Sequence, residues 1–301
     1  MTRLKQRVRA GLVTYAAGDA LGVPWEGYRP GEIAWGDIDR IPQRGDWPPG
    51  ATSDDTAQTL LLASYLAEIG AVIDERSFLD RLAAALPVIR GAGPSTLAAV
   101  ERFQSTGALR ATGGATNGAV MRALPIGWAT ADAQRRRALT TGLSRTTHGD
   151  PRAIGAACVA SAMASAAVDE ASLDTVVGVA VAEVDWLHTQ AGAPVFDLIL
   201  DAATGAWTPS PAGVSLDALE TAAAVVHVLR HAERSRLSPA DGLRYAVSLG
   251  GDTDTVAAIA GGILGCRHHG VDLPWLSRMA LPDNPTVDRL SASLAALRST
   301  A

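Results

Sequence analysis

Apolar and polar positions recur along most of this chain with the period of an α-helix. Within residues 59–69, Leu60, Ala63 and Ala67 lie on one apolar stripe, and Gly70 ends the segment. The same pattern recurs at 78–86, 97–103, 153–168, 175–187, 216–230, 239–248, 256–264 and 286–297. The spacing therefore predicts a helix in each of these segments.

The sequence predicts no strands, because no run of β-branched residues alternates with period two. No Ser/Gly-rich or charged linker divides the chain, and helices rich in Ala and Gly can approach one another closely. We therefore expect one all-α domain over residues 1–301, folded as a compact multi-helix bundle. Two Pro/Gly-rich stretches, 27–50 and 207–213, are predicted to be surface loops. Loops longer than about 12–15 residues without structure of their own are uncommon and often functional.

The charge balance argues against nucleic acid as a partner. The chain has 26 basic and 31 acidic residues, a formal charge of −5. Beyond the first nine positions the one basic run is Arg135 to Arg137, which we interpret as a solvated helix face. Cys158 and Cys266 are too few for a disulfide framework and suit a reducing compartment.

Two stretches imitate membrane signals without meeting their requirements. Basic residues before an apolar run at 10–18 resemble a signal peptide, but the run is short and continues into Asp19. Segment 153–168 is uncharged, yet shorter than the roughly 20 apolar residues of a membrane span. We therefore expect a cytoplasmic protein with no membrane partner. The near-absence of lysine, with Lys5 alone, is typical of a GC-rich bacterial genome.

Two short acidic motifs each precede an apolar helix. The first is Ser-Asp-Asp-Thr at 53–56, and the second is Gly-Gly-Asp-Thr-Asp-Thr at 250–255. Either one taken alone can be a helix N-cap, because Ser and Asp at a helix start accept free backbone N–H groups. A cap needs only one side chain, however, and the second motif supplies three oxygen-bearing groups.

If folding brings the two motifs together, their four carboxylates repel one another unless a cation neutralises them. Hard divalent cations prefer oxygen ligands, and nearby hydroxyl groups complete a shell suited to Mg²⁺ or Mn²⁺. Two cations would use all four carboxylates. The predicted metal ligands are Ser53, Asp54, Asp55, Asp252, Asp254 and Thr255. The alternative is that the motifs lie far apart and merely cap their helices.

Other chemical motifs are weaker. The Gly-rich segment 113–118 can present backbone N–H groups to phosphate oxygens, but it lacks the Gly-Lys-Ser/Thr of a P-loop, so a plain turn stays open. The aspartate-rich diphosphate motif of terpene synthases needs an acid at position 58, where this chain has Gln58. His148, before a predicted helix, fits a capping or core role at least as well as a catalytic one.

No nucleophile or zinc motif is present in the sequence. There is no G-x-S-x-G segment, and neither cysteine lies in a nucleophile motif, which argues against covalent acyl chemistry. His227 and His231 are spaced i,i+4, but Val228 stands where a zinc metalloprotease needs glutamate. We interpret both histidines as surface residues.

Five motifs in this order resemble the ADP-ribosylglycohydrolase family. They are GLVTYAAGDALGVPWE at 11–26, SDDT at 53–56, TNGAVMRALPIG at 116–127, THGDP at 147–151 and GGDTDTVAAIAG at 250–261. The resemblance extends from residue 8 to about residue 275. It implies an all-α orthogonal bundle that holds two Mg²⁺ or Mn²⁺ ions in a cleft, with the six ligands predicted above.

The resemblance also implies roles for further residues. Glu26 corresponds to a mobile acid that serves some members as a base or as a gate over the metals. Segment 113–118 would hold the diphosphate of ADP-ribose, and His148 would contact a ribose. The implied substrate-binding residues are Gly113, Gly114, Thr116, Asn117, Gly118, Met121 and His148.

The implied reaction is hydrolysis of a glycosidic bond that releases ADP-ribose from a protein or a small molecule. Water, made more acidic by the cations, attacks the anomeric carbon C1″ through an oxocarbenium-like state. Asp54, Asp55 or Glu26 would take its proton, and the sequence leaves the choice among them open.

The sequence departs from the family at the acceptor side. Arginine-specific members often carry Asp-Ile-Gly after the third helix, whereas residues 90–96 read Arg-Gly-Ala-Gly-Pro-Ser-Thr, without a carboxylate. We therefore expect an acceptor other than arginine, such as an ADP-ribosylated small molecule or a nucleotide intermediate of a biosynthetic route. Two alternatives are a phosphohydrolase that acts on the diphosphate and a non-catalytic ADP-ribose-binding relative. Loss of metal ligands would mark the binding relative, and all six are present.

Overall fold

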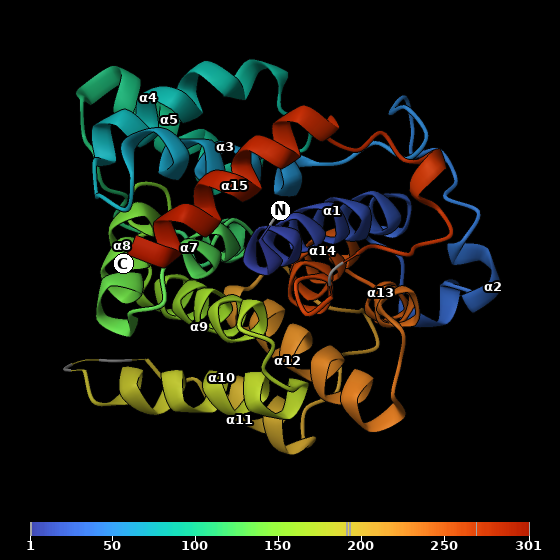
Figure 1. Cartoon of the computed structure of the whole chain (residues 1–301). Helices are drawn as coiled ribbons and strands as arrows, with labels where there is room; N and C mark the ends of the chain where they lie inside the picture. Colours follow the sequence, from blue (N-terminus) through green and yellow to red (C-terminus); the bar gives the residue numbers. More distant parts are fainter. Residues whose placement is uncertain (1, 191, 193, 269, 301) are drawn as a thin grey trace.

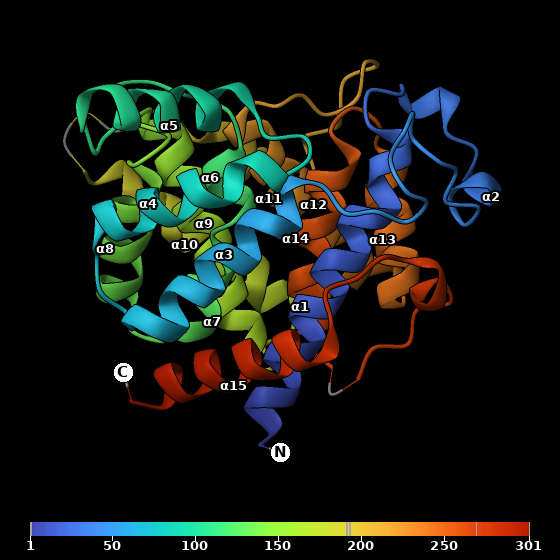
Figure 2. The same ribbon diagram turned by 90° about the horizontal axis from the view of Figure 1, so that it is seen from above.

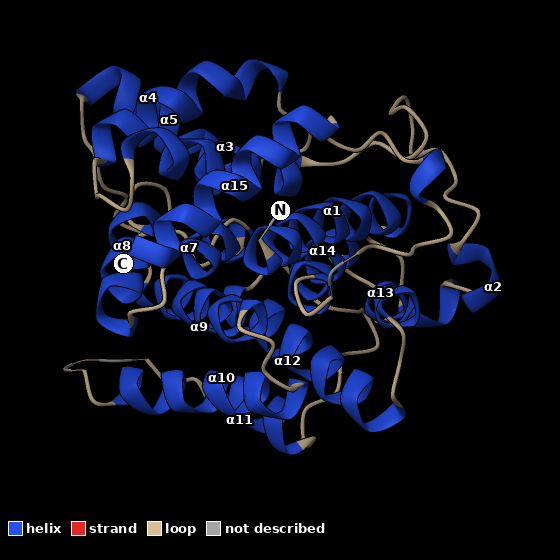
Figure 3. Cartoon of the chain, viewed as in Figure 1, coloured by secondary structure: helices blue, strands red, loops and turns tan. Residues whose placement is uncertain are grey.

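The structure is a computed structural model that describes residues 2–190, 192, 194–268 and 270–300. All regular elements among these residues are helices, and the β-bridges join only single pairs of residues (Figure 3). The α-helices are α1 Arg3–Gly22, α2 Trp35–Ile38, α3 Asp54–Ile69, α4 Glu75–Ala85, α5 Pro94–Thr106, α6 Gly118–Met121, α7 Leu124–Ala129, α8 Ala133–Ser144, α9 Pro151–Val168, α10 Leu173–His188, α11 Asp197–Thr204, α12 Ala218–Ser235, α13 Pro239–Ser248, α14 Thr253–Gly265 and α15 Asn284–Thr300. Short 3₁₀ turns cover Val23–Trp25, Pro30–Glu32, Leu86–Val88 and Leu276–Arg278. The all-α prediction is confirmed.

The helices predicted from apolar spacing are present, with differences at their ends. The predicted helix at 78–86 ends one residue earlier, where a 3₁₀ turn begins at Leu86. The helix predicted to begin at residue 216 begins at Ala218, because Asp217 caps it by accepting from the backbone N–H groups of residues 219 and 220. The hydrophobic pattern thus places helices well and their ends less well.

Helix α1 lies at the centre of the bundle beside α14, and both views show the two helices side by side (Figures 1 and 2). Their backbones approach closely because α1 has glycine at two contact positions. A Cβ atom on Gly18 would lie 2.2 Å from the carbonyl oxygen of Ala257, and one on Gly22 would lie 2.4 Å from the Cα of Asp254. The contact sets Asp19 of α1 beside the first turn of α14.

Helix α9 is the second central helix, packed against α7, α8, α10 and α12. Among the described residues it is the one helix long and apolar enough to cross a membrane. Because 78% of its residues are buried inside the protein, its apolar composition matches the interior of the bundle.

Two surface predictions are wrong in part, because tertiary packing buries some of the residues concerned. Arg135 is exposed, but Arg136 is 6% exposed because α8 packs against α9, and Arg137 donates to Glu183 of α10 at 2.7 and 2.9 Å. His227 and His231 are half-buried, and their rings stack on Tyr245 of α13.

The prediction of a long surface loop at 27–50 is wrong in part. The stretch contains α2 and a 3₁₀ turn, and the side chain of Ile38 is fully buried. Asp39 accepts from Arg244 of α13 at 2.8 and 2.9 Å, which ties this stretch to the bundle. The stretch is therefore an ordered segment, packed against the bundle, that leads into α3.

Candidate functional site

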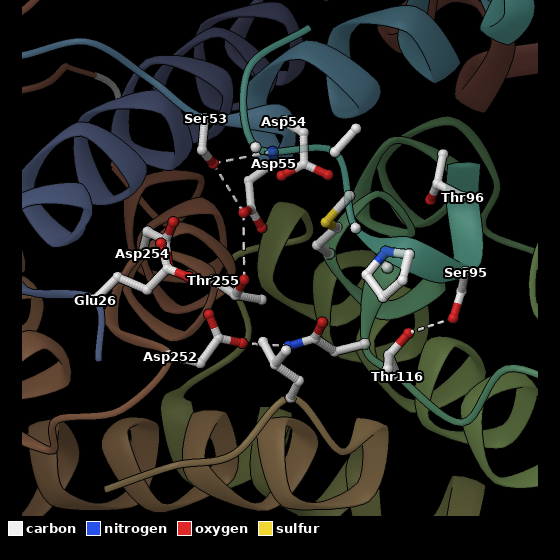
Figure 4. A pocket seen from close by; sticks show the side chains of 18 of the residues that line it. Glu26, Ser53, Asp54, Asp55, Ser95, Thr96, Thr116, Asp252, Asp254 and Thr255 are labelled. Atoms are coloured by element: carbon white, nitrogen blue, oxygen red, sulfur yellow. Dashed lines mark hydrogen bonds between the residues drawn. The ribbon is translucent and has the colours of Figure 1, made fainter. Parts of the chain in front are cut away.

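The two acidic motifs meet where α3 and α14 begin. The hydroxyl of Thr255, in the first turn of α14, donates to Oδ2 of Asp55 in the first turn of α3 at 3.2 Å (Figure 4). This contact joins residues 200 positions apart in the sequence. The alternative that the motifs lie far apart and merely cap their helices is therefore wrong.

Only one of the two motifs works as a helix cap. Ser53 accepts from the backbone N–H of Asp55 at 3.1 Å, so it is the N-cap of α3. Asp252 stands at the N-cap of α14, but its side chain makes no capping hydrogen bond to described residues. Instead its Oδ2 accepts from the amide of Asn117. The carboxylate of Asp252 is thereby turned into the cavity in front of the two helices.

A glycine pair shapes the backbone before Asp252. Gly250 and Gly251 have φ values of 68° and 72°, a region that other residues rarely adopt. A Cβ atom on Gly251 would lie 2.0 Å from the carbonyl oxygen of Val214. Only glycine fits at these two positions, and the tight backbone turn that they allow orients Asp252 toward the cavity.

A cavity of about 340 Å³ opens in front of the acidic motifs. Figure 4 shows Glu26, Asp252 and Asp254 on one side of it and Ser95, Thr96 and Thr116 on the other. Nearly all of the residues predicted for the site line this cavity: Glu26, Ser53, Asp54, Asp55, Thr116, Asn117, Gly118, Met121, His148, Asp252, Asp254 and Thr255. One cavity thus joins the acidic groups to the predicted substrate-binding groups.

Gly113 and Gly114 do not line this cavity. They line a neighbouring hollow of about 350 Å³ together with Arg102 and Thr112. Pro94 and Ser95 border both spaces, so the two hollows share one wall. A ligand that reaches both would pass over Ser95.

The carboxylates of the cavity are strongly perturbed. Burial, followed by repulsion from Asp19, raises the pKa of Asp54 to about 7. Burial also raises the pKa of Asp252 to about 6. The pKa values of Asp55 and Asp254 lie well above the ordinary range for the same reason, increased by neighbouring carboxylates. The protein thus holds an acidic cluster that is unfavourable without a counter-charge.

The donor set fits a hard divalent cation. Oδ1 of Asp55 and Oδ1 of Asp254 are buried and have no hydrogen-bond partner among the described residues. One oxygen each from Asp19, Asp55 and Asp254 lies within 4.8 Å of the others. Buried carboxylate oxygens without partners are costly, and coordination to a cation satisfies them.

Asp19 is a buried member of this cluster that the sequence analysis did not select. Its carboxylate accepts from the backbone N–H of Ser53 and of Thr56 at 3.0 Å, and from the Thr56 hydroxyl at 2.5 Å. These bonds anchor the start of α3 to α1. The sequence signal that could have identified Asp19 is a single acid at the end of an apolar helical run. Such an acid lies in the core only when its oxygens accept hydrogen bonds or bind a cation.

His148 and Thr116 form the opposite wall. Nε2 of His148 lies 3.1 Å from the hydroxyl oxygen of Thr116, which lies 3.0 Å from that of Ser95. Burial, with Arg122 nearby, lowers the pKa of His148 to about 3. The imidazole is therefore neutral at physiological pH.

The sequence analysis also missed the wall beside Glu26. The carboxylate of Glu26 is one-third exposed at the cavity mouth and pairs with the guanidinium of Arg44. The Arg44 guanidinium lies 5.6 Å from the ring of Trp47. Trp47 in turn lies over Gly91, where a Cβ atom would approach the indole to 3.3 Å. This wall is cationic and aromatic, and no local sequence motif marks it.

Two comparisons with known proteins indicate one family. The family model described as ADP-ribosylglycohydrolase matches residues 1–301. An uncharacterised protein of Archaeoglobus fulgidus is 28% identical over 308 aligned positions, which cover 97% of this chain and 96% of that protein. A solved structure described as an ADP-ribosylglycohydrolase-related protein complex is 26% identical, covers 99% of both chains and superposes with a TM-score of 0.79.

Proposed function

Because this chain belongs to the ADP-ribosylglycohydrolase family and is thus a glycoside hydrolase, we propose that it releases ADP-ribose from an acceptor with the help of two divalent cations, Mg²⁺ or Mn²⁺. One observation carries the proposal. The carboxylates of two distant motifs meet at the starts of α3 and α14, in a cavity that also contains hydroxyl groups suited to a sugar phosphate.

The cations would be held by Ser53, Asp54, Asp55, Asp252, Asp254 and Thr255. When bound, they would neutralise the acidic cluster and make a nearby water molecule a better nucleophile. Asp19 would support this set from behind, since its oxygens already accept several hydrogen bonds from the start of α3.

The ADP-ribose part of the substrate would lie along the wall formed by Thr116, Gly118 and Met121. This placement leaves C1″ over the carboxylates and directs the acceptor toward Glu26. Bond formation between the water oxygen and C1″ would break the bond from C1″ to the acceptor, whose electron pair leaves with the acceptor. The proton released by water would then pass to the departing group.

Glu26 is the side chain best placed to take that proton. Oδ2 of Asp55 already accepts from the hydroxyls of Ser53 and Thr255, and Oδ2 of Asp54 accepts from an amide. The carboxylate of Glu26 lies at the mouth of the cavity beside Asp254, is one-third exposed and pairs with Arg44 (Figure 4). A general base there can reach both the attacking water and the departing group.

The acceptor side favours a group other than arginine. A guanidinium leaving group needs an acidic partner, yet residues 91–96 supply none, and Glu26 is paired with Arg44. Arg44 and Trp47 instead offer positive charge and an aromatic face. We therefore infer an uncharged or anionic acceptor.

Product analysis tests the function directly. The protein is incubated with ADP-ribosylated serine, arginine and small-molecule substrates, with Mg²⁺, Mn²⁺ or a chelator, and the products are separated by chromatography. Metal-dependent release of intact ADP-ribose supports the proposal. Release of AMP and ribose phosphate would assign the protein to phosphohydrolases instead. Metal-dependent binding of ADP-ribose in calorimetry without turnover of any substrate would indicate a binding protein.

A further inference from the structure

A continuous chain of hydrogen bonds links the acidic end of the cavity to its hydroxyl end. The chain contains Asp54, Gln58, Arg122, Thr147, His148, Thr116 and Ser95. Four of its side chains are each 2% exposed or less, namely Gln58, Arg122, Thr147 and His148. The proposed reaction uses none of those four, so a buried polar chain of this length needs its own explanation.

Arg122 stands at the centre of the chain, and its guanidinium can only donate hydrogen bonds. Nη1 donates to Oε1 of Gln58 at 2.9 Å and to the carbonyl oxygen of Gly118 at 3.0 Å, and Nη2 donates to the hydroxyl oxygen of Thr147. The guanidinium lies 5.4 Å from the ring of Phe78. Burial lowers its pKa only to about 10, so it remains a cation at neutral pH.

The arm toward the cations follows from this fixed donor. Since Arg122 occupies Oε1 of Gln58, the amide of Gln58 must present Nε2 to its other neighbour. Nε2 lies 2.8 Å from Oδ2 of Asp54 and donates to it. Arg122 therefore holds Asp54 in one orientation through Gln58.

The arm toward the substrate follows in the same way. The hydroxyl oxygen of Thr147 accepts from Arg122 and lies 2.8 Å from Nδ1 of His148. Thr147 is 1% exposed, so its own proton would be buried without an acceptor unless Nδ1 accepts it. The proton of the neutral imidazole then sits on Nε2, which donates to Thr116.

The donor on Nε2 of His148 also sets the direction of the hydrogen bonds made by the hydroxyls of Thr116 and Ser95. Thr116 accepts from His148, and its proton is free for Ser95 or for a ligand. When the hydroxyl oxygen of Ser95 accepts a hydrogen bond from Thr116, the hydroxyl of Ser95 can donate its own hydrogen bond to a ligand in the cavity. The Thr116–Ser95 pair thus presents a donor to the cavity, and a donor selects an oxyanion such as a phosphate group.

We propose that Arg122 is a positioning residue that sets the direction of the whole hydrogen-bond chain: it orients Asp54 for a cation through Gln58, and through Thr147 and His148 it makes the Thr116–Ser95 pair a donor to a phosphate oxygen of the ligand. This deepens the proposed function and rests on it, because the phosphate is taken to be that of ADP-ribose. It also assigns His148 to the support of Thr116.

Four variants separate the two arms. Gln58→Met interrupts the arm to Asp54, Thr147→Val interrupts the arm to Thr116, and Arg122→Met interrupts both. Thr140→Val is the matched control, because Thr140 is a fully buried threonine of α8 whose hydroxyl bonds to the carbonyl oxygen of Arg136 and the hydroxyl of Ser161. Each full-length protein is titrated with Mn²⁺ alone, and with ADP-ribose and inorganic pyrophosphate. The protonated nitrogen of His148 is identified by ¹⁵N NMR, and circular dichroism checks the helix content.

In wild type, we expect the proton of His148 on Nε2. Thr147→Val should remove the preference for this tautomer, so that both tautomers of His148 are populated, and weaken ADP-ribose and pyrophosphate binding about tenfold, the effect of one hydrogen bond to a charged group. Mn²⁺ affinity should then stay within about twofold of wild type. Gln58→Met should do the reverse, with Mn²⁺ affinity about tenfold weaker and the tautomer of His148 unchanged. Arg122→Met should show both losses, and Thr140→Val neither.

A wild-type proton on Nδ1 of His148 would overturn the proposal, as would unchanged anion affinity and tautomer in Thr147→Val. Unchanged Mn²⁺ affinity in Gln58→Met would overturn the arm to Asp54. If Arg122→Met fails to fold, the two single-arm variants still decide the matter. Wild-type protein that binds Mn²⁺ and pyrophosphate but not ADP-ribose would refute the proposed function while leaving the direction of the chain supported.

Discussion

Removing one charge from the acidic cluster should stabilise the metal-free protein. Asp254 is 4% exposed, its Oδ1 has no partner among the described residues, and its carboxylate has one oxygen within 4.8 Å of an oxygen of Asp55 and of Asp19. The variant Asp254→Asn keeps the shape of this side chain, removes its charge and offers N–H donors to the remaining carboxylates.

The expected gain follows from the spacing of the charges. When both carboxylates are ionised, two unit charges no more than 4.8 Å apart repel by at least about 3.5 kcal/mol at an effective dielectric constant of about 20. Since the amide of the variant is still a buried polar group, we expect a net gain of about 2–3 kcal/mol for Asp254→Asn. At about 2.1 cal/mol/K per residue, 301 residues give an unfolding entropy of about 0.6 kcal/mol/K, so Tm should rise by about 3–5 °C.

Excess Mn²⁺ should reverse the order of the two proteins. A ligand present at about 1,000 times its Kd stabilises the native state by about 4.1 kcal/mol, which exceeds the gain expected for Asp254→Asn, and the variant loses this stabilisation with its ligand oxygen. Thermal unfolding at pH 8, in chelator and in Mn²⁺, measures both effects.

Asp174→Asn is the matched control for this experiment. Asp174 also occupies the second position of a helix, α10, but it is exposed. Its loss should cost about 0.3–1 kcal/mol through the helix dipole and leave the response to Mn²⁺ unchanged. A metal-free Asp254→Asn protein no more stable than wild type would refute the electrostatic reasoning.

Three further predictions follow from the same structure. Gly18→Ala should cost about 3 kcal/mol in urea unfolding, because its Cβ would meet the backbone of α14, whereas Gly178→Ala should gain about 0.5–1 kcal/mol, since no described atom lies within 4 Å of its Cβ position. His148 has a pKa of about 3 in the folded state and about 6.5 when unfolded, so its contribution to stability is complete above pH 6.5 and falls by about 2 kcal/mol at pH 5. Comparing urea unfolding of wild type and His148→Asn at pH 7.5 and 5 isolates this contribution, and an unchanged difference would contradict a buried neutral imidazole. Asp54→Ala and Asp252→Ala should each abolish metal-dependent turnover with circular dichroism near wild type, and retained turnover in both would exclude the dinuclear mechanism.

The sequence was informative where chemistry is carried by local motifs. Ser53 and Asp252 each stand at a helix start. The paired carboxylates of the two motifs predicted that both motifs share one metal site, and in the fold both line the same cavity. The position of Ser53 follows from a capping preference, which acts over a few residues, whereas Asp252 stands at a helix start without capping it. Their meeting depends on the packing of α1 against α14, which neither the spacing nor the resemblance to a family specifies.

Residues whose roles depend on distant partners could not be predicted. Gln58 served only to exclude a terpene-synthase motif, yet its amide holds Asp54. Arg136 was part of a basic run that looks solvated, but it is buried by helices that are remote in sequence. Arg44 contacts Glu26 from a Pro/Gly-rich stretch whose internal structure has no periodic signal.

The contact between α1 and α14 has a consequence for synthesis of the protein. The hydroxyl of Thr253 donates to the carbonyl oxygen of Gly22 across 231 positions of sequence. At roughly 5–20 residues per second, α1 waits roughly 12–46 s on the ribosome before its partner exists. During this time its apolar face has no partner helix and the acidic cluster cannot assemble. Because this contact joins segments so distant in sequence, we expect the cavity to form only at a late stage of translation.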